Sequence, residues 1–270
     1  MAKEKGIPTR GVLRQTKANL TTEHNRFFAN TKLDYFIEHY WTVSWDLTGK
    51  EPYLAETLPY PSVHIVFEKG NSKIFGVTKG RFSTLLEGKG SVFGIKFRPG
   101  GFYPFFQKNI SILTDKTIPI SEFTKENILS LEKTIFQKED EESRINIIET
   151  WLEKILPERD PKIPLINTMI DKMKEDRTIQ SVDQISKLFS INLRSLQRLF
   201  REYVGVSPKW VIQRFRIQEV AERMEKEKTI PYAEMALELG YYDQAHFIKD
   251  FKNTIGLSPE EYLKTIFESK

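Results

Sequence analysis

The chain has 270 residues, which is enough for two domains with separate hydrophobic cores. It contains no cysteine, so disulfides, thiolate metal ligands and cysteine nucleophiles are excluded. Its 41 lysines and arginines against 37 acidic residues give a net charge of only +4. This charge is too small to indicate a nucleic-acid partner, so any such evidence must come from where the basic residues lie along the chain.

Short apolar or alternating runs dominate the first part of the chain. Residues 1–30 are polar and are expected to form a loosely ordered arm. Beyond them, β-branched and aromatic runs bounded by glycines predict strands. The predicted strands cover 40–45, 63–67, 73–77, 82–86 and 92–97. The separators at 69–72 and 87–90 are typical of hairpins, so an antiparallel β sandwich or barrel is expected.

The hydrophobic period changes from two to about 3.6 after Pro119. Helices are predicted over 126–137, 142–156 and 165–175. Prolines at Pro157, Pro161 and Pro164 break the chain between the second and the third of these helices. We therefore expect an α+β chain of two domains. A β-rich effector-binding or dimerisation domain with a helical linker covers 1–160, and an all-α domain covers 161–270.

The last third of the chain contains an internal repeat. Residues 196–208 align with residues 247–259 at a constant offset of 51. Each copy has an apolar helical stripe, a glycine suited to a left-handed helix stop, and a Ser-Pro that opens the next helix. Upstream, a capping residue (Asn192 or Asp243) follows a short helix predicted over 182–189 or 232–239. This order predicts two helix-turn-helix units, joined by a helix over 209–225.

A charged helix face is no sign of DNA binding by itself, because any amphipathic helix pair exposes its charges to solvent. Two copies at a fixed offset, each with a basic face, favour DNA binding over that interpretation. The second helices, at about 193–204 and 244–255, would enter successive major grooves about 34 Å apart.

The segment from Ile163 to Glu268 resembles the DNA-binding domain of the AraC/XylS family of transcriptional regulators. The matching motifs are Leu196 to Arg201, Gly205-Val206-Ser207-Pro208, Gly240-Tyr241, and Phe247 to Lys252 followed by Gly256-Leu257-Ser258-Pro259. The resemblance implies a seven-helix fold that binds double-stranded DNA in the bacterial cytoplasm, as an activator or a repressor. Ser190 departs from it, because the first turn more often has glycine. Ala245 and Ile248 also depart, because they replace longer polar residues on the second reading face.

The resemblance assigns base contacts to exposed residues of the second helix in each unit. These are Arg194, Gln197 and Arg198 in the first unit, and Gln244, Ala245, His246 and Lys249 in the second. Their chemistry agrees, since arginine pairs with the guanine edge and glutamine with the adenine edge. Arg201 and Lys252 lie further along their helices and are expected beside phosphates. Arg198 is expected to matter most.

Residues 57–67, 76–82 and 94–102 resemble an uncharacterised β-rich domain at the front of one subset of AraC-like regulators, which implies a sensor role and names no ligand. Aromatic residues of the predicted strands either line an apolar cavity or form the core: Trp41, Trp45, Tyr60, His64, Phe67, Phe75, Phe97 and Phe102. Arg98 either captures an anion or is a turn arginine satisfied by a carboxylate or carbonyl. The candidate effector contacts are Trp41, Trp45, His64, Phe97 and Arg98.

Other classes of function find less support. The histidines (His24, His39, His64 and His246) have no metal-ligand spacing, and neither a Gly-x-Ser-x-Gly nor a phosphate-binding glycine loop occurs. We expect no enzyme, no metal and no cofactor. No apolar run approaches the roughly 18–20 residues of a membrane span, so a cytoplasmic protein with no membrane partner is expected.

The resemblance to AraC-like regulators also implies three further partners. They are a small-molecule effector, RNA polymerase and a second copy of the chain. The competing hypothesis is a small-molecule-binding or enzyme-like β domain whose helical domain serves only protein interaction. The arginines at 194, 198 and 201 argue against this hypothesis, because it gives no reason why three arginines lie on one face of the same helix.

Overall fold

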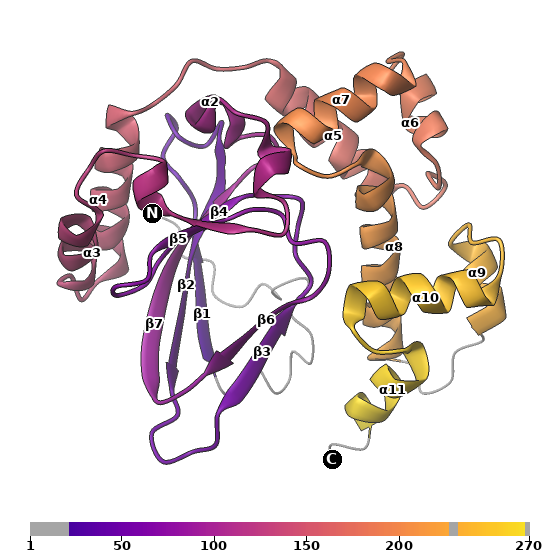
Figure 1. The fold of residues 1–270 in the computed structure, drawn as a ribbon, viewed down its shortest axis with the longest axis horizontal. Coiled ribbons are helices and arrows are strands. Elements are labelled where there is room, and N and C mark those ends of the chain that lie inside the picture. Colours follow the sequence, from indigo (N-terminus) through magenta and orange to yellow (C-terminus); the bar gives the residue numbers. More distant parts are fainter. Residues whose placement is uncertain (1–21, 227–231, 268–270) are drawn as a thin grey trace.

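The computed structural model describes residues 22–226 and 232–267, with a β-rich N-terminal half and a helical C-terminal half (Figure 1). The expected α+β class is confirmed. One antiparallel sheet has the order β1-β2-β7-β4-β5-β8, and β3 and β6 form a separate two-stranded sheet. The larger sheet, as described, has open edges at β1 and β8 and is not closed into a barrel. The strands are β1 Thr22–Phe27, β2 Ile37–Asp46, β3 Tyr53–Thr57, β4 His64–Phe67, β5 Lys73–Phe75, β6 Phe82–Leu86, β7 Lys89–Phe97 and β8 Thr117–Pro119.

All five predicted strands are present, whereas β1, β3 and β8 were not predicted. The expected arm over 1–30 is wrong at its end, because β1 pairs with β2 from Thr22 opposite Trp45 to Phe27 opposite Tyr40. The strand was missed because most of it is polar and only Phe27 is buried. Residues 1–21 of the expected arm lie outside the described residues.

One of the two predicted hairpins is correct. Residues 69–72 join β4 to β5, which pair antiparallel. Residues 87–90 do not form a hairpin between neighbours, because β6 pairs with β3 whereas β7 pairs with β2 and β4. The chain crosses there from the small sheet to the large one, with Gly88 in the left-handed region at φ 56°.

The main core lies between one face of the large sheet and helices α3 (Ile128–Phe136) and α4 (Glu141–Lys154), which cover that face in Figure 1. Phe67 from the sheet meets Trp151 from α4 edge to face, with ring centroids 5.8 Å apart. Glu149 of α4 is buried and accepts hydrogen bonds from the backbone and side chain of Asn30, which fixes the chain before β2.

The predicted helices agree with the structure to within three residues at each end. Short helical turns lie on both sides of β8: α2 (Tyr103–Phe106) and η1 (Ile110–Leu113) precede it, and η2 (Ile120–Glu122) follows it. The C-terminal helices are α5 Lys162–Glu175, α6 Val182–Leu188, α7 Leu193–Tyr203, α8 Pro208–Met224, α9 Tyr232–Glu238, α10 Gln244–Ile255 and α11 Pro259–Phe267.

The proline-bearing joint between the halves is held from both sides. It runs from the end of α4 at Lys154 to the start of α5 at Lys162. Tyr35 donates its hydroxyl to the carbonyl of Asp160 at 2.7 Å, and Tyr203 donates to the Asp160 carboxylate at 2.6 Å. The joint therefore packs against both halves.

Loops of the β domain also enter the cores of the helical half. Leu58 belongs to the cluster around the second helix-turn-helix unit, and Val77 to the cluster around the first. Between them Arg214 of α8, only 3% exposed, donates to the carbonyls of Pro59 at 2.7 Å and Leu58 at 2.8 Å. The two halves share a packed interface along α8.

Candidate nucleic-acid interface

The first helix-turn-helix unit is built from α6, a tight turn and α7. Ser181 and Gln184 form a capping box at the start of α6. Ser190 turns the chain with φ 52°, in the left-handed region that favours glycine. Asn192 then caps α7 by accepting from the amide of Ser195 at 2.9 Å. The turn that departs from the family pattern therefore keeps the glycine-like geometry with a serine.

Two faces of α7 have opposite character. Leu196 and Phe200 are fully buried in the core of the first unit. The residues predicted to contact bases or phosphates all lie on the exposed side: Arg194, Gln197, Arg198 and Arg201. Their side chains make no hydrogen bond or ion pair with any other described residue. This face is cationic and unpaired.

The second unit repeats the arrangement with α9 and α10. Gly240 makes the turn at φ 77°, and Asp243 caps α10 by accepting from the amide of His246 at 2.7 Å. The predicted residues of α10 are exposed: Gln244, Ala245, His246, Lys249 and Lys252. His246 lies 3.7 Å from Asp250, and Lys252 lies 4.0 Å from Glu261. Ile248 does not belong to this exposed face, because it packs against the core of the second unit.

Helix α8 joins the two units and is buried along most of its length. Ser207 caps it and Pro208 opens it, as predicted, after Gly205 at φ 92°. Arg216 is 3% exposed and donates to three carbonyls near the end of α5 and in the segment before α6, those of Met173, Asp176 and Ile179. Arg214 and Arg216 are therefore structural arginines, which sequence reasoning did not separate from surface cations.

The candidate effector residues of the β domain do not line one common cavity. Trp41 donates its indole N–H to His64 Nδ1 at 3.3 Å. Trp45 lies over Gly90, toward the other end of the same strands. Phe97 is completely buried in the main core, as are Phe67 and Phe102. Arg98 donates to the carbonyl of Asp34 at 2.6 Å, as the turn-arginine alternative predicted.

A polar row lies on the sheet face opposite the main core. His39, Lys96 and His64 are direct cross-strand neighbours on β2, β7 and β4. Burial, followed by the charge of Lys96, lowers the pKa of His39 to about 2 and that of His64 to about 3. The Lys96 ammonium pairs with Glu38 at 2.9 Å and lies 4.0 Å from the centre of the Tyr60 ring.

Tyr60 connects this polar row to the helical half, because its ring also packs 5.8 Å from that of Phe215 in α8. Of the three residues in this polar row, only His64 is among the site residues predicted from the sequence. Lys96 belongs to the row because side chains alternate between the two faces of a strand, so Lys96 lies on the face opposite the buried Phe97.

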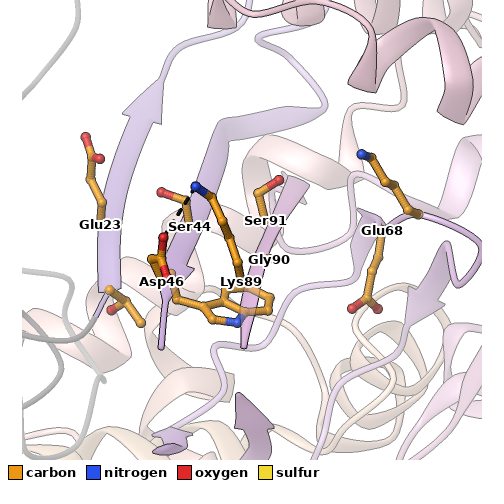
Figure 2. A pocket seen from close by; sticks show the side chains of 10 residues that line it. Glu23, Ser44, Asp46, Glu68, Lys89, Gly90 and Ser91 are labelled. Atoms are coloured by element: carbon orange, nitrogen blue, oxygen red, sulfur yellow. Dashed lines mark ion pairs between the residues drawn. The ribbon is translucent and has the colours of Figure 1, made fainter. Parts of the chain in front are cut away.

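An open groove of about 860 Å³ lies at the far end of the large sheet (Figure 2). It is lined by Thr22, Glu23, Ser44, Trp45, Asp46, Glu68, Lys69, Lys89, Gly90 and Ser91. Lys89 and Asp46, which are cross-strand neighbours in this lining, form an ion pair of 3.3 Å, drawn as a dashed line in Figure 2. Trp45 is the only effector candidate that lines it.

Within the described ranges, no group of three or more histidine, aspartate or glutamate residues is arranged to hold a metal ion. Over the same ranges, every helix is too short or too polar to span a bilayer.

Two family models match the chain. Residues 25–119 match a domain of unknown function (DUF6597), and residues 185–265 match a helix-turn-helix domain. The chain is 30% identical over 102 residues to an uncharacterized HTH-type transcriptional regulator of Haemophilus influenzae, covering 37% of this chain and 34% of the relative. It is also 30% identical over 100 residues to the HTH-type transcriptional regulator MtrA of Neisseria gonorrhoeae, covering 37% and 32%. The chain spans about a third of the length of these curated relatives.

Solved structures similar to the chain include ToxT from Vibrio cholerae and the C-terminal domain of AraT from Geobacillus stearothermophilus. ToxT has 14% sequence identity and a TM-score of 0.38, covering 91% of this chain and 97% of ToxT. The AraT domain has 20% identity and a TM-score of 0.36, covering 39% and 88%. With the family matches on both halves, the chain combines an AraC-type helix-turn-helix domain with an N-terminal domain of unknown function.

Proposed function

We propose that the protein is a sequence-specific DNA-binding transcriptional regulator that inserts α7 and α10 into two successive major grooves. The observation that carries the proposal is the exposed face of α7, where three arginines and a glutamine stand unpaired opposite a fully buried apolar face. A second capped helix of the same build follows beyond the rigidly packed α8. Cations held in this way neutralise phosphates and reach base edges.

The individual roles follow from position along each helix. Arg194, Gln197 and Arg198 occupy the first two turns of α7 and are proposed to contact bases. Gln244, His246 and Lys249 hold the corresponding part of α10. Arg201 and Lys252 lie one turn further along and are proposed to bind phosphates.

The experiment begins with duplexes selected from a random library by the full-length protein. Arg198→Ala is expected to weaken binding by about 1–3 kcal/mol and to relax preference at one base pair, whereas Lys252→Ala weakens all sequences alike. Lys133→Ala, which removes an exposed cation from α3, is the charge-matched control and should bind as the wild type does. Equal and uniform losses for Arg198→Ala and Lys252→Ala would contradict the division into base and phosphate contacts.

We place the domain boundary between residues 160 and 161, within the segment left between the two family matches. The β domain is proposed to bind a small-molecule effector near Trp41 and His64, because Tyr60 links that face to α8. Operator titrations of the wild type and Trp41→Leu, with and without cell extract, test this. An effect of extract that persists unchanged in Trp41→Leu would contradict the placement.

The proposal also includes a cytoplasmic location, contact with RNA polymerase and pairing with a second copy of the chain. Cell fractionation, a supershift with added polymerase and sedimentation of the DNA complex test these three parts separately.

A further inference from the structure

The turns of the two helix-turn-helix units are alike up to one point. The amides of Phe189, Ser190 and Ile191 donate to carbonyls of α6, and those of Leu239, Gly240 and Tyr241 donate to carbonyls of α9 at an offset of 50. From the N-caps onward, Asn192 and Asp243, the offset is 51. The second turn is thus one residue longer. The extra residue is Tyr242.

Tyr242 has none of the usual structural roles of its position. A hydrophobic residue before the N-cap commonly packs against the fourth helical residue. In the first unit Ile191 packs against the cluster that contains Leu196. In the second unit Tyr241 takes this role, with its ring 5.5 Å from that of Phe247. Tyr242 is 92% exposed and contacts no described residue by hydrogen bond or ring packing.

Tyr242 comes directly before the N-cap of α10, the helix whose exposed residues are proposed to contact DNA. Directly after its cap come Gln244 and Ala245, both exposed, and Lys249 follows one turn later. Ala245 stands where the first unit has Arg194, so the first turn of α10 lacks the cation that the first turn of α7 presents. A tyrosine is suited to a surface that becomes covered, because its ring buries area while its hydroxyl hydrogen-bonds.

We propose that Tyr242 is a contact to the DNA backbone, donating its hydroxyl to a phosphate oxygen beside the groove that α10 enters and laying its ring on the adjacent deoxyribose. The inference rests on the proposed function, and it adds to the proposed DNA contacts a residue that has no counterpart in the first unit. Backbone contacts of this kind fix the position of a recognition helix and carry no sequence information. Tyr242 would add a backbone contact at the start of α10, where the side chain of Ala245 offers no polar group.

The test measures binding of the full-length protein to two labelled duplexes, one selected from a random library and one with the same base pairs scrambled. The variants are Tyr242→Ala, Tyr242→Phe and the control Leu129→Ala, which removes a 71% exposed side chain from α3. Because Tyr242 is almost fully exposed, its variants should unfold at the wild-type temperature.

We expect Tyr242→Ala to lose about 5- to 20-fold in affinity for both duplexes. Tyr242→Phe should lose about two- to threefold, because it removes only the hydrogen bond of the hydroxyl. The salt dependence should stay unchanged, because no cation is removed. Wild-type affinity in Tyr242→Ala would overturn the inference and leave the residue free for a protein partner. A loss confined to the selected duplex would overturn the backbone assignment. If the wild type itself binds neither duplex, the proposed function fails first.

Discussion

The contact of Arg214 with the β domain gives the sharpest prediction about how the halves are coupled. Its guanidinium donates to the carbonyls of Leu58 and Pro59 across the interface and to the Gln218 side chain within α8. Burial lowers the pKa of Arg214 to about 10. The change we propose is Arg214→Met, which keeps an unbranched but shorter side chain and removes every donor.

The expected cost follows from the groups left behind. Two carbonyls lose their partner in a buried interface, at about 1–3 kcal/mol each. Part of this loss is offset, because the buried charge and its desolvation cost disappear as well. We therefore expect unfolding to be easier by about 2–4 kcal/mol, with the loss concentrated at the interface between the halves.

Arg216→Met is a matched control, because Arg216 is equally buried but donates to carbonyls within the helical half. Urea unfolding should separate into two transitions in Arg214→Met, and the joint between residues 155 and 161 should become sensitive to protease. Arg216→Met should lower stability and keep the halves coupled. A single, unshifted transition in Arg214→Met would refute the reasoning.

Three further predictions concern the turn, the polar row and the domain boundary. Ser190→Gly should raise the stability by about 0.5–1 kcal/mol in urea unfolding, since it relieves the left-handed serine at φ 52°; an unchanged or lower midpoint would contradict this. The pKa values of His39 and His64 are lowered in the folded protein, so their contribution is complete above about pH 6.5 and is lost as pH falls toward the folded values, at up to about 1.4 kcal/mol per pH unit for each histidine. His39→Gln should therefore flatten the dependence of stability on pH between 5 and 6, and an unaltered slope would argue against a buried neutral imidazole. A fragment of residues 162–270 should fold and bind the operator without responding to effectors, but with lower stability than the full chain, because it lacks Leu58 and Val77 from its two cores; a fragment that calorimetry finds unfolded would contradict separable domains.

The repeat was predictable because its chemistry is local. Caps, glycine stops and Ser-Pro helix starts each depend on a few neighbouring residues, so Asn192, Gly205 and Pro208 could be assigned from the sequence alone. The extra residue in the second turn stayed hidden because the alignment was anchored downstream of it. Only the backbone hydrogen bonds show that Tyr241, and not Tyr242, corresponds to Ile191.

The β domain was less predictable because its arrangement depends on long-range pairing. The polar strand β1 is recognisable only through its partner β2. The sequence also gives no sign that β6 and β7 belong to different sheets. For this reason the segment predicted as a hairpin between them is a crossover from one sheet to the other. Burial of charge is equally non-local: Arg214 and Arg198 look alike in the sequence, yet one donates to the β domain and the other faces solvent.

The central claim is that α7 and α10 read two successive major grooves, and protection of guanine N7 against methylation tests it most directly. Bound to a selected duplex, one copy of the full-length protein should protect guanines in two major-groove patches about one helical turn apart, on the same side of the DNA. Arg198→Ala should lose protection in one patch and keep the other. A single protected patch in the wild type, or protection independent of sequence, would contradict the account.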